Sequence, residues 1–186
     1  MAQKIQFTSD SSGSEEQMKG SDGRANVSSR TDSRAYYNSR DKSEAFSLVW
    51  DDASSAAGDY IVYWKNTDTT GRTLVLESVG LNSEQAASFK LAVVTGTAAA
   101  GSTISPFCLN RATPKSAQAV AMEAAGTAIT GLSVVGTVDH ASCSADGHEE
   151  FRLDDRLRLG QDQAIAIEYE QGTTGRTWGV IFGYYE

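Results

Sequence analysis

Short stretches in which apolar and polar residues alternate fill the chain from Ala45 onward. In the segment 88–94, Phe89, Leu91 and Val93 occupy every second position, a period typical of strands with one buried face. The segment Asp59–Trp64 is apolar on both faces, as expected of a central strand covered on both sides. Further strands are predicted at Ala45–Asp51, Asp59–Lys65, Thr73–Val79, Phe151–Leu159, Ile165–Glu170 and Trp178–Tyr185.

One segment, Ala117–Ala125, fits a helix and a strand about equally well. Its Ala, Met and Glu favour a helix, but nine residues are marginal for one. We predict a strand because every neighbouring segment is one, and we expect Pro106 and Pro114 to bracket a loop. Many short strands without interleaved helices predict an all-β sandwich or closed barrel.

The pentapeptide Thr69–Thr73 recurs letter for letter as Thr173–Thr177. Each copy lies between two apolar strands and is interpreted as a hairpin turn with its glycine at positive φ. The spacing of a phosphate-binding loop is absent, so the repeat does not indicate nucleotide binding.

The first 35 residues are rich in Ser, Gly, Asp and Arg and contain few apolar groups. Such a segment buries too little surface to offset its ordering entropy, so we expect it to be flexible on its own. The predicted organisation is a polar N-terminal arm, residues 1–44, followed by a β-sandwich domain, residues 45–186. The arm is either a solvated tail or a segment that orders on a partner. Arginine and tyrosine are common interface anchors, and they favour partner binding through Arg24, Arg30, Arg34, Tyr36, Tyr37 and Arg40.

Charge narrows the possible partners. The 186 residues carry a formal net charge of −8, and residues 45–186 contain 9 basic and 17 acidic side chains. Phosphate backbones repel such a surface, so we expect no nucleic-acid partner. No apolar run approaches the length of a membrane span, and the N-terminus lacks the apolar stretch of a secretion signal, so we expect cytoplasmic synthesis and no membrane partner.

Candidate chemistry is sparse. His140, Cys143 and His148 lie within nine residues and are possible zinc ligands, but their spacing matches no zinc motif. We interpret the segment Ala141–Gly147 as a surface loop and Cys108 and Cys143 as free, partly buried thiols. No Gly-x-Ser-x-Gly motif occurs, and the adjacent acids of Asp51-Asp52 and Asp154-Asp155 point to opposite faces of a strand. We therefore predict no catalytic residue, no metal and no cofactor.

Aromatic residues offer a second kind of candidate site. Exposed Trp and Tyr could stack on sugars, but in β-rich chains such rings more often fill the core. We expect the core role for Trp50, Tyr60, Tyr63, Trp64, Trp178, Tyr184 and Tyr185.

The order of several segments is similar to that of small virion structural proteins of tailed bacteriophages. The segments that carry this resemblance are Tyr36–Asp41, Trp64–Asp68 leading into Thr73–Ser78, Leu109–Arg111, Ser116–Ala119, Ile129–Leu132 and Leu159–Ile167. It covers about residues 36–186 and implies a jelly-roll-like β-sandwich. In such a fold the charged strand Arg152–Arg158 would protect a sheet edge from unwanted pairing.

The resemblance implies a capsid decoration or cement protein that stabilises the shell by bridging capsid subunits. Its partner would be the major capsid protein, its location the capsid surface of the virion, and its state a homo-oligomer, with a trimer favoured. Two alternatives stay open. One is a phage tail or fibre-associated domain that binds host glycans, and the other is a metal-dependent or hydrolytic site around His140, Cys143 and His148.

Overall fold

The computed structural model describes residues 6–8, 15–17 and 34–186. It divides the chain into two compact units, Met1–Asp32 and Ser33–Glu186. In the first unit, β1 (Gln6–Thr8) pairs antiparallel with β2 (Glu15–Gln17). The flexibility expected for the first 35 residues concerns positions that lie mostly outside the described residues.

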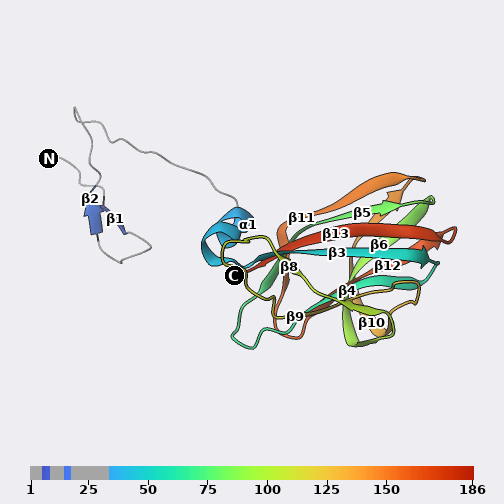
Figure 1. Ribbon diagram of the computed structural model, residues 1–186, viewed down its shortest axis with the longest axis horizontal. Coiled ribbons are helices and arrows are strands. Elements are labelled where there is room, and N and C mark those ends of the chain that lie inside the picture. The colour runs from blue at the N-terminus through green and yellow to red at the C-terminus, as the bar shows by residue number, and fades with distance from the viewer. Residues whose placement is uncertain (1–5, 9–14, 18–33) are drawn as a thin grey trace. The chain divides into compact units, whose positions relative to one another are not determined.

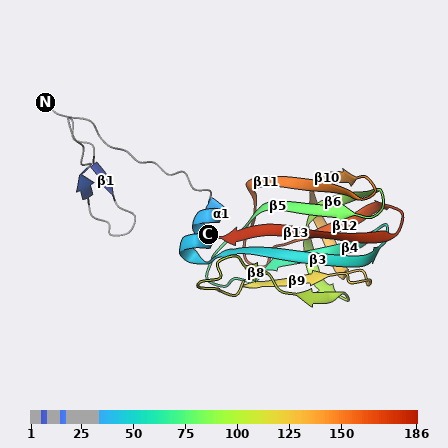
Figure 2. The same ribbon diagram turned by 45° about the horizontal axis from the view of Figure 1, so that its top comes forward.

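The second unit is a sandwich of two antiparallel sheets, which confirms the predicted all-β fold (Figure 1). The larger sheet has the order β10 (Thr130–Cys143), β6 (Ala87–Ala99), β12 (Ala164–Gly172), β4 (Asp59–Asn66), β9 (Ala119–Glu123) and β7 (Ser102–Ile104). The smaller sheet has the order β11 (Gly147–Leu159), β5 (Leu74–Ser83), β13 (Gly175–Tyr185), β3 (Ala45–Ser55) and β8 (Phe107–Cys108). Figure 2 shows β11, β5, β13 and β3 following one another across one layer.

The eight long strands follow the order of a jelly roll. Numbered along the chain from β3 to β13 without the short β7, β8 and β9, they lie in the order 1-8-3-6 in one sheet and 2-7-4-5 in the other. Every step between them except that from β6 to β10 therefore crosses from one sheet to the other. One end of the sandwich, which we call the root end, holds α1 (Arg34–Tyr37), the π-helical turn η1 (Asn38–Lys42) and the C-terminus (Figure 1).

The main core fills the space between the sheets with aromatic and branched side chains. Trp50, Trp64 and Phe46 are fully buried in it, and Phe89 meets Tyr169 edge to face with ring centroids 5.3 Å apart. The core role expected for the aromatic residues is confirmed for Trp50, Tyr63, Trp64, Tyr184 and Tyr185, all of which are buried.

A second, smaller core lies on the other face of the larger sheet. In β12, Ile165 and Ile167 belong to the main core, whereas the alternating Ala164 and Ala166 belong to a cluster with Tyr63. An isolated bridge between Tyr60 and Ile129 joins β4 to the residue before β10. Because β10 otherwise pairs with β6, this bridge brings the start of β10 back over β12 and covers the alanines. The doubly covered strand predicted at Asp59–Trp64 is thus confirmed.

The edge strand β11 of the smaller sheet is interrupted by a bulge. β11 ends the smaller sheet, as expected for the charged strand Arg152–Arg158, and its register skips from Arg152 to Leu157. Asp154 and Asp155 adopt positive φ within this bulge, which interrupts the edge.

The strand predicted within Ala117–Ala125 is confirmed as β9, which lies between β4 and β7 in the larger sheet.

Other sequence predictions were wrong. β10 was not predicted, because nearly all of its residues are exposed and it shows no alternation of burial. It includes Ala141–Cys143, so the predicted loop at 141–147 shrinks to residues 144–146. The two copies of the repeated pentapeptide are not hairpin turns, since the strands on either side lie in different sheets. Gly71 has φ +88°, as expected, but Gly175 does not have positive φ.

The close contact between β13 and its neighbours gives a first prediction. A Cβ at Gly179 would lie 2.3 Å from the Gly80 carbonyl oxygen and 2.4 Å from the Trp50 ring. We expect Gly179→Ala to lower the free energy of unfolding by about 2 kcal/mol or more in urea titrations followed by fluorescence. Gly136→Ala is the matched control, because nothing lies within 4 Å of its Cβ position, and its effect should stay within about 0.5 kcal/mol. Equal effects of the two substitutions would contradict this account of the packing.

Candidate partner-binding surface

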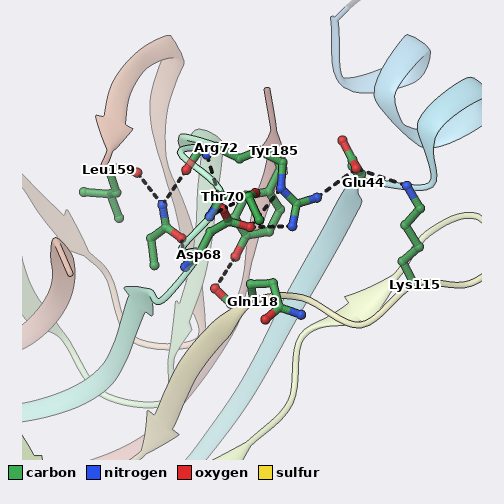
Figure 3. Close-up of polar contacts among 9 residues, drawn as sticks. Glu44, Asp68, Thr70, Arg72, Lys115, Gln118, Leu159 and Tyr185 are labelled. Carbon is green, nitrogen blue, oxygen red and sulfur yellow. Dashed lines mark hydrogen bonds and ion pairs between the residues drawn. The ribbon is translucent and has the colours of Figure 1, made fainter. Parts of the chain in front are cut away.

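The root end is organised around one buried carboxylate, Asp68, in the connection between β4 and β5 (Figure 3). Its side chain is 0% exposed. One oxygen accepts hydrogen bonds from the Thr70 amide at 2.7 Å and the Thr70 hydroxyl at 2.6 Å. The other accepts from Arg72 Nε at 2.8 Å and from Arg72 Nη2. The bonds from Thr70 and Arg72 outweigh burial and hold the pKa of the Asp68 carboxyl well below its usual range.

Asn66 extends this arrangement to the end of β11. Its side-chain nitrogen donates to the Arg72 carbonyl at 3.0 Å and to the Leu159 carbonyl at 2.8 Å. Its side-chain oxygen accepts from the Asp68 amide at 2.9 Å. All the polar atoms of this buried amide side chain are therefore used to fix the connection.

Arg72 carries the network toward the surface. Its Nη1 atom donates to Glu44 at 2.8 Å, and Glu44 also pairs with Lys115 at 3.1 Å (Figure 3). The guanidinium lies 5.0 Å from the centroid of the Tyr185 ring. Burial raises the pKa of the Tyr185 hydroxyl, which donates to the Gln118 carbonyl at 2.7 Å. One arginine thus connects the start of β3, the end of β13 and the segment 109–118.

Residues 34–42, which we call the tyrosine turn, lie next to Glu44 at the outer end of this network. Asn38 is buried, and its carbonyl accepts a hydrogen bond from the Glu44 amide at 3.0 Å. The Asn110 side chain donates to the Arg40 carbonyl at 3.1 Å, and the hydroxyls of Ser43 and Thr113 are 2.6 Å apart. The tyrosine turn is therefore tied to the sandwich by both backbone and side-chain contacts.

The tyrosine turn presents two adjacent rings to solvent. Tyr36 and Tyr37 are 44% and 45% exposed. The Arg40 guanidinium lies 5.2 Å from the Tyr36 centroid, and the Lys42 ammonium lies 5.5 Å from the Tyr37 centroid. Arg34 pairs with Glu186 at 3.0 Å, which joins the turn to the C-terminus. This arrangement can supply two aromatic anchors, each with a cation at its face.

Four of the six residues predicted for partner binding come together in this surface: Arg34, Tyr36, Tyr37 and Arg40. Arg24 and Arg30 lie outside the described residues. Lys42 belongs to the same surface and was not predicted from the sequence. Phe107 was also missed, although it is 53% exposed with the Arg111 guanidinium 4.7 Å from its centroid. Arg111 follows Phe107 by four residues, but in a segment predicted to be a loop this spacing does not indicate a contact.

The histidine and cysteine candidates are separated between the sheets. His140 in β10 contacts Glu170 at 3.1 Å, and His148 in β11 contacts Asn82 at 3.1 Å. Cys108 and Cys143 are free and buried, and burial raises the pKa of the Cys143 thiol. Within residues 6–8, 15–17 and 34–186, no group of three His, Cys, Asp or Glu side chains is arranged to hold a metal ion. Asp51 is exposed and Asp52 buried, which confirms that this acidic pair faces two ways.

The Asp68 network generates a pH-dependent prediction. Because the pKa of Asp68 is lower in the folded chain, its ionised form stabilises the fold above the unfolded pKa of about 3.9. That contribution is lost as the pH falls from about 3.9 toward the lower folded-state pKa. We expect Asp68→Asn to lower the free energy of unfolding by about 3 kcal/mol at neutral pH, and this deficit to shrink below about pH 4.

Urea titrations at several pH values would measure this deficit. Asp162→Asn is the control, because Asp162 pairs with Lys65 while its side chain is 66% exposed. We expect that variant to change stability by about 0.5 kcal/mol or less. A deficit of Asp68→Asn that does not vary with pH would contradict the assignment.

No protein family, curated protein or solved structure matches this chain. Among the helices of the described residues, none is long and apolar enough to cross a membrane. Any functional proposal therefore draws on side-chain geometry and on the resemblance found in the sequence.

Proposed function

We propose that this chain is a non-catalytic structural protein of a bacteriophage virion, most simply a head decoration or cement protein. In this proposal the tyrosine turn binds the major capsid protein. The sequence resemblance supports the capsid of a tailed bacteriophage as the assembly to which the chain binds. The observation that carries the binding role is the pair of exposed rings, Tyr36 and Tyr37, each with a cation at its face on an anchored turn.

The chemistry of these side chains suits a protein partner. Tyrosine and arginine are enriched among the residues that dominate the binding energy of protein interfaces. Each tyrosine combines the apolar area of its ring with a polar hydroxyl. A partner surface with apolar pockets would match Tyr36 and Tyr37.

The hydrogen bonds that fix the tyrosine turn favour tight association. Binding costs entropy whenever side chains or loops must be ordered at the interface. The bonds from Glu44, Asn110 and Thr113 hold the turn in place before any partner arrives. Less ordering is then required on binding, and more of the contact energy appears as affinity.

Charge favours one orientation of approach. Residues 45–186 have 9 basic and 17 acidic side chains, whereas residues 34–44 have three basic and two acidic ones. An acidic partner would therefore be repelled less by residues 34–44 than by the rest of the sandwich. If the chain forms an oligomer, as the resemblance implies, several such contacts would act together and bridge neighbouring capsid subunits.

The glycan-binding alternative depends on exposed rings that can stack on sugars. Trp50 and Trp64 are buried in the core, and Arg176 lies 5.2 Å from the centroid of the partly buried Trp178 ring. The tyrosine turn could still serve such a role in a tail or fibre-associated domain. A glycan array distinguishes the two proposals, since the decoration role predicts no signal.

The decoration proposal predicts a specific loss of attachment. We expect Tyr36→Ser combined with Tyr37→Ser to weaken binding to capsids of the source phage at least about tenfold, in a sedimentation assay. The melting temperature should change by only a few degrees, because both rings are nearly half exposed. The matched control is Val134→Ser combined with Val135→Ser, which removes exposed apolar groups from β10 instead.

Two results would overturn the proposal. One is equal capsid binding by the tyrosine variant and the control. The other is absence of the chain from the particle in cryo-electron microscopy of purified virions, whereas density confined to the tail would favour the adsorption alternative.

A further inference from the structure

One side of the sandwich ends in two very short strands that lie far from β10 and β11. β7 ends the larger sheet and β8 ends the smaller one, and only Ser105 and Pro106 separate them along the chain. A groove of about 480 Å³ lies where the chain passes from one sheet to the other. Its lining comes from β7, β8, β9 and the segment between β8 and β9. We call it the edge groove.

The walls of the edge groove combine apolar and polar side chains and are partly open to solvent. Phe107 and Val120 are 53% and 45% exposed, and Ile104, Pro106 and Pro114 also line it. Exposed apolar surface that gathers at a concave site is typical of a binding site rather than of a bare surface.

The charge of the edge groove is opposite to that of the molecule. Its lining includes two cations, Arg111 and Lys115, and no carboxylate, in a chain of net charge −8. Lys115 is engaged by Glu44 at 3.1 Å. Arg111 lies over the Phe107 ring and has no ion pair within the described part of the chain. A groove that joins exposed apolar side chains to a guanidinium without an ion pair among the described residues is complementary to a ligand that combines apolar and acidic groups.

The backbone around the edge groove suits an extended ligand. β7 pairs with β9 on one side only, and β8 pairs with β3 on one side only, through Phe46 and Ser47. The outer edge of each strand is unpaired among the described residues. Free strand edges can receive an added strand, in which backbone bonds give affinity and alternate side chains give specificity.

We propose that the edge groove binds an extended peptide segment of a partner protein in which acidic and apolar residues alternate. Its apolar side chains would lie against Phe107 and Val120, and a carboxylate would pair with Arg111. A single-stranded nucleic acid shares the negative charge, but two cations on an acidic molecule provide little phosphate attraction. This site is separate from the proposed function of the tyrosine turn and does not depend on it.

Fluorescence anisotropy with labelled decapeptides tests the proposal on the full chain. The first peptide alternates aspartate or glutamate with valine or isoleucine. The second has lysine at each acidic position, and the third keeps the acids but has serine at each apolar position. We expect only the first to bind, and we include an oligothymidine of similar length as a nucleic-acid probe.

Variants then locate the binding. Arg111→Glu should raise the Kd of the first peptide at least about tenfold. Arg156→Glu is the matched control, because Arg156 is an exposed arginine of β11 on the opposite side of the sandwich, and it should leave the Kd unchanged. Peptide-induced amide shifts in nuclear magnetic resonance spectra should fall within residues 103–121.

Four results of these binding experiments would overturn the proposal. These are absence of binding up to about 1 mM peptide, equal binding of the acidic and lysine peptides, stronger binding of the oligonucleotide, and an equal Kd for Arg111→Glu and the control. Shifts within residues 103–121 that grow with protein concentration and without peptide would show that a second copy of the chain fills the groove.

Discussion

The root end of this protein depends on the neutralisation of one buried carboxylate. Asp68 is inaccessible to water, so its charge is tolerable only because Thr70 and Arg72 surround it with donors. Arg72 in turn reaches Glu44, which precedes β3, and lies over Tyr185, near the end of β13. The two chain ends of the sandwich and the base of the tyrosine turn are therefore held by a single ion-pair network. Removing the charge at its centre would release several surface segments together.

The two cores explain how a chain of this size builds a rigid platform. Large rings between the sheets supply most of the buried apolar surface, as in other sandwiches. The alanines of β12 permit close approach on the opposite face, so the start of β10 can fold back and bridge to Tyr60. The neighbouring strands β12 and β4 are thus covered on both faces. The exposed large apolar side chains lie mainly at the tyrosine turn, around the edge groove and in β10, with Val49 of β3 as an exception.

Alternation identified long strands that have one face against a core, because burial of one face imposes a period of two. β4 was identified instead from its run of apolar residues, since both of its faces are covered. Alternation failed for β10, whose exposed residues satisfy no such constraint. It also could not assign strands to sheets, because alternation does not encode whether a connection crosses between sheets. The crossing from β4 to β5, for example, is fixed by contacts such as that of Arg72 with Glu44. For the site, the clustering of Arg34, Tyr36, Tyr37 and Arg40 was readable because they lie close in sequence. Arg111 and Phe107 are also near neighbours, as are Asp68, Thr70 and Arg72, but alternation predicts no contact within such connecting segments. Only the folded chain buries Asp68 and places Arg72 against Glu44 and Tyr185.

The jelly-roll order has a practical consequence for the end of the sandwich opposite the root. The connection between β10 and β11, residues 144–146, is short and exposed, and it lies there with the connections that leave β3, β5 and β12. Exposed turns of this kind tolerate inserted sequence better than packed segments do. A foreign epitope placed at Ala145 would be carried away from the tyrosine turn and from the C-terminus. Sequence inserted at this end would thus leave the Asp68 network and the tyrosine turn undisturbed.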